Sequence, residues 1–190
     1  MTEESSPLTS SAAENIFSGA PSFSLKNRLA RAVWAVVWTV FASWTPPPLH
    51  GWRIFLLRAF GAKIGAGCRV YRSVRVWYPP HLVMGAQSVM GPRVICYNQG
   101  IITIGERAIV SQGAHLCTGT HDIRDPSFQL LVRPIHIGAG AWIAAEAFVA
   151  PGVFCGERAV LGARGVAFAD LEPNFVYRGN PAVKIKQRFL

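Results

Sequence analysis

The stretch 137-IGAGAWIAAEAFVAPGVFCGERAVLGARGV-166 repeats one pattern every six residues. In each of its five hexads the first residue is aliphatic or Cys, the second is Gly or Ala, and the fifth is Ala, Val or Gly. Neither a helix, with its period of 3.6, nor an ordinary strand, with its period of 2, produces this spacing. Short strands joined by tight turns do, because small residues fit the corners and the first residue of each hexad points inward. The stretch therefore predicts a β-solenoid with three strands to a coil, whose coils bury a core only by stacking.

The same hexads recur in earlier parts of the chain, with two extra residues before the second and third blocks. The earlier blocks span residues 64–75, 84–95 and 104–121. Residues 122–136 fit no hexad and separate the block that ends at His121 from the block that begins at Ile137. Insertions in a solenoid become loops on one face, and loops on a rigid scaffold often carry function.

The chain divides into four expected segments. We expect a disordered polar tail over residues 1–23 and an apolar helical segment over 24–60. The solenoid would span 61–168 with the inserted loop 122–136, and a short C-terminal extension would follow over 169–190. The fold class is therefore mainly β.

The helical segment contains a nearly uncharged run of 13 residues, 32–44. This run is shorter than the roughly 20 residues that a helix needs to cross a bilayer. Basic residues precede the run, and Trp34, Trp38 and Trp44 lie along it. Two interpretations stay open: the segment caps the open end of the solenoid, or it makes peripheral contact with a membrane surface.

The composition excludes some classes of protein. Apolar residues make up 51% of the 190 residues, which is too many for a disordered chain. The formal net charge is +9, but most of the cations are single arginines spread along the chain, so we expect no nucleic-acid partner. The four cysteines form no CxxC pair and the start shows no signal-peptide pattern. Free thiols in the cytoplasm, at most at the inner face of the membrane, are the expectation.

His121 stands where the regular pattern stops, immediately before the inserted loop. Imidazole titrates near neutral pH and can take a proton from a hydroxyl and return it later. Asp122 could orient the ring, or it could simply begin the turn. Both residues are candidate catalytic groups.

Three stretches carry a resemblance to a known family: "TGTHD" before the loop, the hexads from "PIHIGAGAW" onward, and "GNPAVKI". Over roughly residues 61–190 they resemble the hexapeptide-repeat acyltransferases, specifically the sugar O-acetyltransferases of the maltose, galactoside and nodulation-factor type. The apolar N-terminal segment and "FGAKIG" are similar to a subgroup assigned to colanic acid biosynthesis. The resemblance implies a left-handed parallel β-helix, a homotrimer, and acetyl-CoA-dependent O-acetylation of a sugar or exopolysaccharide intermediate. His121 would be the general base, with backbone N–H groups as donors to the oxyanion.

The resemblance also implies an acetyl-CoA groove along the later coils, between subunits of the trimer, and no metal. Trp142 matches the tryptophan of the family, and small residues match the positions beside the pantetheine arm. Cations of the C-terminal tail would lie near the cofactor's phosphates. The small residues are Ala145, Gly162 and Ala163, and the cations are Arg178, Lys184 and Lys186. The chain departs from the family at Phe168 and Ala169, where relatives often carry Thr-Lys.

The acceptor site is less specified. Tyr97 and Asn98, in 96-CYNQG-100, could bind sugar hydroxyls or could form the turn that absorbs the two-residue slip. An acetylated Cys117 is a rival route to direct transfer. Two other classes stay open: a zinc enzyme like the gamma-class carbonic anhydrases, using His115, His121 and His136, and a non-catalytic, membrane-docked solenoid scaffold. The spacings of these histidines do not match the paired histidines of the zinc family.

Overall fold

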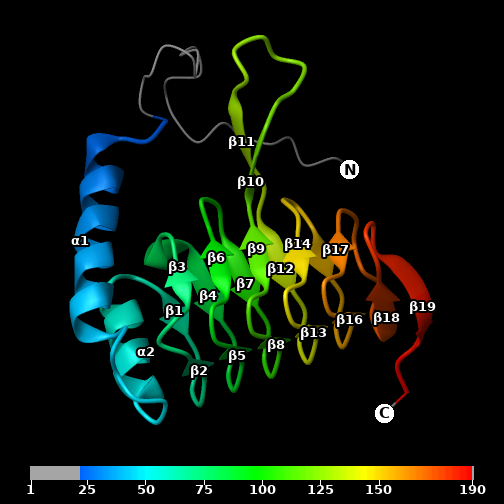
Figure 1. Cartoon of the computed structure of the whole chain (residues 1–190), viewed down its shortest axis with the longest axis horizontal. Helices are drawn as coiled ribbons and strands as arrows, with labels where there is room; N and C mark the ends of the chain where they lie inside the picture. The colour runs from blue at the N-terminus through cyan, green and yellow to red at the C-terminus, as the bar shows by residue number, and fades with distance from the viewer. Residues whose placement is uncertain (1–21, 190) are drawn as a thin grey trace.

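The computed structural model describes residues 22–189, which form a solenoid of short parallel strands with two helices at one end (Figure 1). The strands stack into three parallel sheets, one for each side of the coil. The mainly β, parallel solenoid predicted from the hexads is confirmed.

The chain enters the three sheets in turn. The first contains β1 (Lys63–Ile64), β4 (Leu82–Met84), β7 (Ile102–Ile104), β12 (Ile135–Ile137) and β15 (Phe154–Cys155). The second contains β2 (Arg69–Val70), β5 (Val89–Met90), β8 (Ile109–Val110), β13 (Trp142–Ile143), β16 (Val160–Leu161) and β18 (Phe175–Arg178), with β19 (Val183–Gln187) antiparallel at its edge. The third contains β3 (Arg75–Val76), β6 (Ile95–Tyr97), β9 (His115–Cys117), β14 (Phe148–Val149) and β17 (Val166–Ala167). A short 3-10 turn, η2 (Pro79–His81), precedes β4.

The first residue of each hexad forms the core. In the first sheet this column consists of Ile64, Met84, Ile104, Ile137 and Cys155, all buried. The two-residue slips lengthen β4 and β7, and each added stretch points one more aliphatic side chain inward, Leu82 and Ile102, both fully buried. The slips therefore widen the core without breaking the stacking.

The second residue of each hexad lies against the next coil. A Cβ at Gly85 would stand 2.5 Å from the backbone nitrogen of Glu106, and one at Gly105 would stand 2.6 Å from that of Ala139. Real Cβ atoms do not approach so closely, so these corners require glycine. Coil spacing is thus set by backbone contact.

Two helices cover the first coil. The helix α1 (Leu25–Phe41) begins at Ser24, whose hydroxyl accepts a hydrogen bond from the backbone N–H of Asn27. Trp34 on its inner side is buried and donates its indole N–H to the carbonyl of Val76 at 2.8 Å. In α2 (His50–Ala59), the fully buried Arg53 donates to the carbonyl of Val70 at 2.7 Å and to three further oxygens of the chain between the helices. Both helices therefore cap the open end of the solenoid.

The solenoid extends beyond residue 168, so the boundary expected at that residue is wrong. Leu171 bridges Cys155 in the first sheet, and β18 pairs with β16 in the second. The hexad pattern does not predict this last coil. Tyr177 pairs with Leu161 and follows it by sixteen residues, whereas a regular coil of three hexads would place the paired residue two positions later. In addition, a turn at Pro173 replaces the usual glycine corner of this coil.

The expected disordered tail falls mostly outside the described residues. Of its last two residues, Phe23 packs its ring against Trp77 with centroids 4.9 Å apart, so it belongs to the folded body. Within residues 22–189 no helix combines the length and hydropathy needed to cross a membrane.

Candidate active site

An antiparallel ribbon stands off the solenoid between β9 and β12 (Figure 1). Its strands are β10 (Gly119–His121) and β11 (Leu130–Val132), and His121 pairs with Leu130. We call residues 119–132 the arm. The insertion therefore begins at Gly119 rather than at residue 122, and the expectation that His121 occupies the last scaffold position is wrong. The hexad spacing of residues 116–121 concealed this, because the partner of β10 is another strand of the arm and not the neighbouring coil.

The arm fixes the ring of His121. Its Nδ1 lies 2.8 Å from the carbonyl oxygen of Phe128, and the two rings stack with centroids 4.4 Å apart and planes 5° apart. A carbonyl oxygen only accepts, so Nδ1 carries the proton and, in the neutral ring, Nε2 presents a free lone pair. This is the tautomer that a general base needs.

Asp122 begins the turn of the arm. Its Oδ1 accepts from the backbone N–H of Arg124 at 2.9 Å, and its own N–H donates to the carbonyl of Gln129 at 2.9 Å. The hydrogen-bond partner of the His121 ring is therefore the Phe128 carbonyl and not Asp122. Sequence reasoning missed Phe128. Its φ of 53° and its carbonyl direction arise from the arm's turn, for which no signal in the sequence was available.

Asn98 and Tyr97, the two candidate acceptor-binding residues, differ in burial and in hydrogen bonding. Asn98 is fully buried, and its amide accepts from the N–H of Tyr78 at 3.0 Å and donates to the carbonyl of the same residue at 2.7 Å. Its side chain links two coils, and because it is buried with both polar atoms bonded to Tyr78, it is not placed to bind a sugar. Tyr97 is half-buried, and its hydroxyl accepts from the amide of Gln99 at 2.9 Å, which leaves its own O–H available as a donor.

The remaining candidate groups are His115, His136 and Cys117. Burial lowers the pKa of His115, whose Nε2 lacks a hydrogen-bond partner among the described residues. The ring of His136 stacks on Phe154 with centroids 4.8 Å apart. Burial raises the pKa of the Cys117 thiol, which donates to the carbonyl of Gly119 and is therefore a poor nucleophile. In the part of the chain that the structure describes, no three His, Cys, Asp or Glu side chains are grouped to hold a metal ion.

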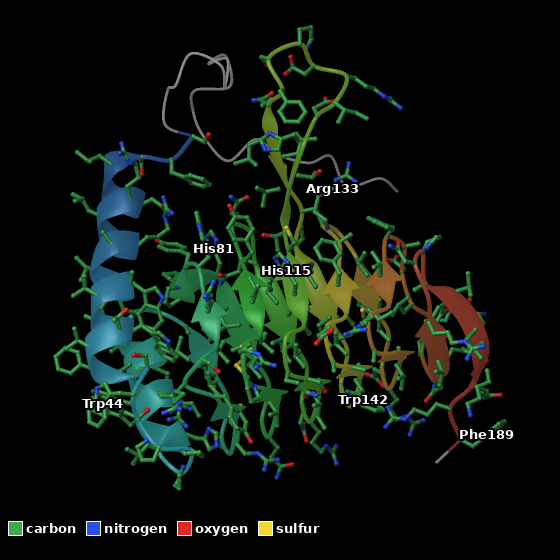
Figure 2. The ribbon with its side chains drawn as sticks, in the orientation of Figure 1. Trp44, His81, His115, Arg133, Trp142 and Phe189 are labelled. Atoms are coloured by element: carbon green, nitrogen blue, oxygen red, sulfur yellow. The ribbon has the colours of Figure 1, made fainter. Side chains whose placement is uncertain are left out.

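A groove of about 820 Å³ runs beside Trp142 on the second sheet. Trp142 is labelled in Figure 2. Its walls are formed by Arg107, Ile109, Ala139, Gly140, Ala141, Trp142, Glu157, Arg158 and Arg188. The indole of Trp142 is 44% exposed, and its N–H donates to the hydroxyl of Ser111 at 2.8 Å. An indole ring held by this hydrogen bond presents a flat apolar surface to a ligand in the groove.

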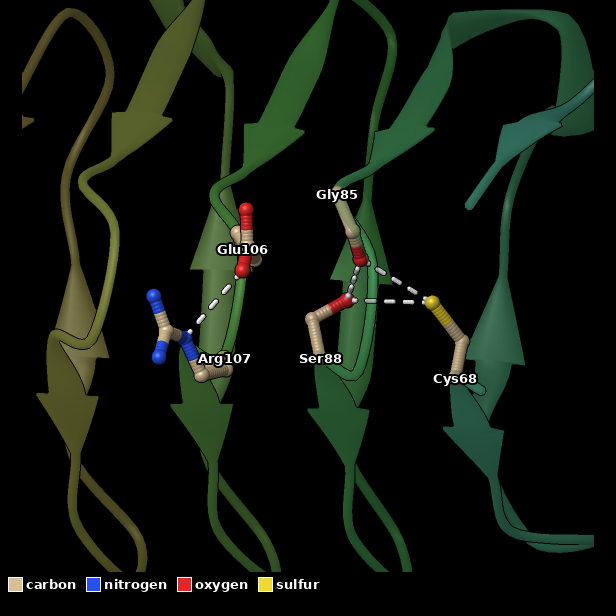
Figure 3. Close-up of polar contacts among 5 residues, drawn as sticks. All are labelled: Cys68, Gly85, Ser88, Glu106 and Arg107. Carbon is tan, nitrogen blue, oxygen red and sulfur yellow. Dashed lines mark hydrogen bonds and ion pairs between the residues drawn. The ribbon is translucent and has the colours of Figure 1, made fainter. Parts of the chain in front are cut away.

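Three arginines border this groove. The guanidinium of Arg188 donates to the carbonyls of Gly140 and Arg158, both at 3.0 Å, so this side chain lies against the groove wall. Arg107 forms an exposed ion pair with Glu106 at 3.2 Å (Figure 3). Sequence reasoning missed all three cations. A signal existed for two of them, since Arg107 and Arg158 occupy the same place in two "GER" hexads, two coils apart once the arm is set aside.

The other residues expected to bind cofactor divide into two sets. Ala145, Gly162 and Ala163 lie at the corner between the second and third sheets. There the N–H of Gly162 donates to the carbonyl of Tyr177 at 2.7 Å, and a Cβ on Gly162 would meet the Cβ of Arg178 at 3.4 Å. The structure thus brings Arg178 to this small-residue corner.

The two lysines of β19 have different surroundings, and Lys184 lies opposite Tyr177 in the sheet. Lys184 pairs with the carboxylate of Glu172 at 2.5 Å and lies over the ring of Phe175 at 4.3 Å, while Lys186 is exposed. Lys184 already has partners for its charge, which reduces its value as a phosphate ligand.

The arm and the groove belong to different parts of the coil. The arm connects the third sheet to the first, whereas Trp142 and the groove lie on the second sheet and its corner with the first. Within one chain the width of a sheet face separates them.

Known proteins resemble the chain in sequence and in fold. No family model matches it. An acetyltransferase assigned to colanic acid biosynthesis, WcaF of Escherichia coli K12, is 47% identical over 155 residues, which cover 82% of this chain and 85% of that protein. A maltose O-acetyltransferase from Clostridium difficile 630 has the same fold, with a TM-score of 0.78, 23% identity, and coverage of 88% of this chain and 90% of that one. A hexapeptide-repeat acetyltransferase from Vibrio cholerae, solved with acetyl coenzyme A, also has this fold. Its TM-score is 0.79 and its sequence identity 20%, and the match covers 90% of this chain and 93% of that one.

Proposed function

Since the chain belongs to the hexapeptide-repeat acetyltransferases, we propose that it transfers the acetyl group of acetyl-CoA to a hydroxyl of a sugar or exopolysaccharide intermediate. Support for the donor comes from the Vibrio cholerae neighbour, solved with acetyl coenzyme A. Support for a carbohydrate acceptor comes from the names of the relatives, which point to colanic acid and to maltose. The cytoplasm, where acetyl-CoA is made, is the compartment that this reaction requires.

One observation carries the role of His121: the bond from its Nδ1–H to the carbonyl of Phe128. With that proton placed, Nε2 takes the proton of the acceptor hydroxyl while the hydroxyl oxygen attacks the thioester carbonyl. His121 then holds the proton as the tetrahedral intermediate collapses and passes it to the departing sulfur. Each proton and each acetyl group is accounted for, and no covalent acetyl-enzyme is required.

The groove beside Trp142 fits acetyl-CoA by the chemistry of its walls. Phosphates need cations, and Arg107, Arg158 and Arg188 border the groove, with Arg178 at the neighbouring corner. A narrow pantetheine chain needs close approach to backbone, which Gly162 and the two alanines at that corner permit. We assign the phosphates to Arg158, Arg178 and Arg188, and we leave Lys184 and Arg107 out because Glu172 and Glu106 already pair with them.

We propose a homotrimer, and the separation of arm and groove supports it. Each chain offers an arm from one part of its coil and a groove from another. Cyclic symmetry would place the arm of one chain over the groove of its neighbour and would repeat the arrangement three times. On the acceptor side we keep Tyr97, whose O–H can donate, and exclude Asn98, which is fully buried and bonded to the backbone of Tyr78.

Replacing Arg188 with alanine is expected to raise KM for acetyl-CoA by about tenfold and to leave kcat within about twofold, because one charge-assisted contact to phosphate is lost. Initial rates measured against acetyl-CoA concentration, with thiol detection of released CoA, would show the split. Lys186→Ala, an exposed cation outside the groove lining, serves as the matched control. Equal KM values for the Arg188 variant and the wild type would place the phosphates elsewhere.

The proposed function itself is tested by CoA release against free sugars, nucleotide sugars and lipid-linked oligosaccharides. Mass spectrometry of the product should show a gain of one acetyl group on the accepted compound. A gain on an amine instead of a hydroxyl, or no turnover with any carbohydrate, would reject the carbohydrate O-acetylation.

A further inference from the structure

The outer side of the two capping helices is apolar and faces away from the solenoid. On α1 the exposed apolar residues follow one another at steps of three or four, which places them in one stripe. The stripe is continued by the connection to α2 and by α2 itself. These residues are Leu25, Leu29, Val33, Val36, Val40, Phe41, Trp44, Leu49, Trp52 and Phe55, each between 40% and 66% exposed. We call them the outer apolar face.

Side-chain contacts join the two helices into this single surface. The indole N–H of Trp52 on α2 donates to the carbonyl of Phe41 at the end of α1, at 2.7 Å. Trp52 also stacks on Phe55 with ring centroids 5.6 Å apart. In Figure 2, Trp44 lies at the helical end of the molecule, far from the C-terminal strands. Ten large apolar side chains gathered at one end are more than the scattered exposed residues of an ordinary surface.

Polar groups on this face are bonded within the chain although they are exposed. The indole N–H of Trp44 donates to the carbonyl of Val40 at 2.6 Å, and the hydroxyl of Ser43 donates to the carbonyl of Thr39 at 2.8 Å. Water could satisfy these donors if the face were permanently wet. Internal bonds matter when a face enters an apolar medium, because there an unpaired donor costs free energy.

The charge around the face has one sign. Between Glu14 and Glu106 the chain carries ten lysines and arginines and no acidic residue, whereas residues 106–190 carry nine basic and seven acidic residues. Lys26 and Arg28 are exposed on the first turn of α1, and Arg69 and Arg72 are exposed on the first coil. The positive charge is therefore concentrated at the helical end, next to the outer apolar face.

We propose that the outer apolar face docks on an anionic phospholipid bilayer, with α1 and α2 lying in the headgroup region and the solenoid held in the water beside it. The basic residues would meet the phosphates of anionic lipids, and the tryptophans would lie at the level of the headgroups. At 17 residues α1 is about 26 Å long, shorter than the roughly 30 Å hydrocarbon core, so it lies along the surface. A protein partner with an acidic rim is the alternative occupant, and it fits less well because the indole donors are already bonded internally.

The test is sedimentation of the full chain with vesicles. Vesicles of phosphatidylcholine with 30% phosphatidylglycerol are expected to bind the protein at least tenfold more tightly than vesicles of phosphatidylcholine alone, a preference that 0.5 M salt should abolish. The variant Leu29→Gln/Val33→Gln/Val36→Gln is expected to bind anionic vesicles at least tenfold more weakly. Its helix should persist, since glutamine is a good helix former and these positions are exposed.

The matched control is Ala35→Gln/Thr39→Gln, at exposed positions of α1 off the stripe, which should bind vesicles like the wild type. Turnover of a soluble acceptor should be unchanged in both variants, so a failure of docking is distinguishable from a failure of the proposed reaction. Equal vesicle binding by the triple variant and the wild type would overturn the proposal. So would absence of vesicle binding together with a larger assembly that the triple variant dissolves, because the face would then be an interface between proteins.

Discussion

Replacing His121 with alanine is expected to lower kcat for acetyl transfer by about 10³-fold, the usual contribution of a general base. The free Nε2 lone pair would be lost, while the ladder of the arm, made by backbone groups, would persist. KM for acetyl-CoA should change little, since the groove lies on a different part of the coil. Single-turnover measurement of acetyl transfer to the accepted sugar would isolate the chemical step.

Asp122→Asn is the matched variant for this experiment. The asparagine oxygen can still accept from the N–H of Arg124, so the turn is kept while the carboxylate charge is removed. We expect activity within about twofold of the wild type, since charge at this position is not part of the ring's support. A loss as large as that of His121→Ala would show that the carboxylate acts on the imidazole in the working enzyme and that the turn role is insufficient.

Replacing Gly105 with alanine is expected to have the largest effect on stability, lowering the free energy of unfolding by about 3 kcal/mol or more. The new Cβ would meet the backbone of Gly138 and Ala139 in the next coil, at 2.6 to 2.9 Å. Backbone cannot move aside there without losing the bond from the N–H of Gly105 to the carbonyl of Ile137, now 2.7 Å long. Urea denaturation followed by circular dichroism would measure the loss.

Gly51→Ala provides the control for added volume. Gly51 lies in α2 with nothing within 4 Å of its virtual Cβ, and alanine is the better helix former by about 1 kcal/mol. This variant should be as stable as the wild type or more so. If Gly105→Ala unfolded at the same urea concentration as Gly51→Ala, the coils could not be in the close backbone contact that the structure has.

Much of the candidate site could be predicted from particular residues, and the errors share a cause. The sequence points to His121 because it stands where the hexads stop, and to Trp142 because it matches the tryptophan of the resembled family. The arginines of the groove and the carbonyl of Phe128 were missed because their neighbours come from other coils or from the turn of the arm. The sequence leaves two interpretations of Asn98 open, because a polar side chain that bonds the backbone of a turn cannot be told by sequence from one that binds a sugar.

The solenoid, its inward columns and its glycine corners can be predicted from the amino-acid order alone, because a six-residue period is a local property that needs no knowledge of distant contacts. Three features depend on contacts made in the folded chain: the atom that holds the ring of His121, the cations that border the groove, and the continuation of the last coil to β18. The tertiary structure also decides that the capping helices bury Trp34 on one side while a row of leucines and valines is left outside. These outcomes depend on which coil lies beside which, and with an arm inserted between two hexads and a shortened final coil, that register is set by packing and not by spacing along the chain.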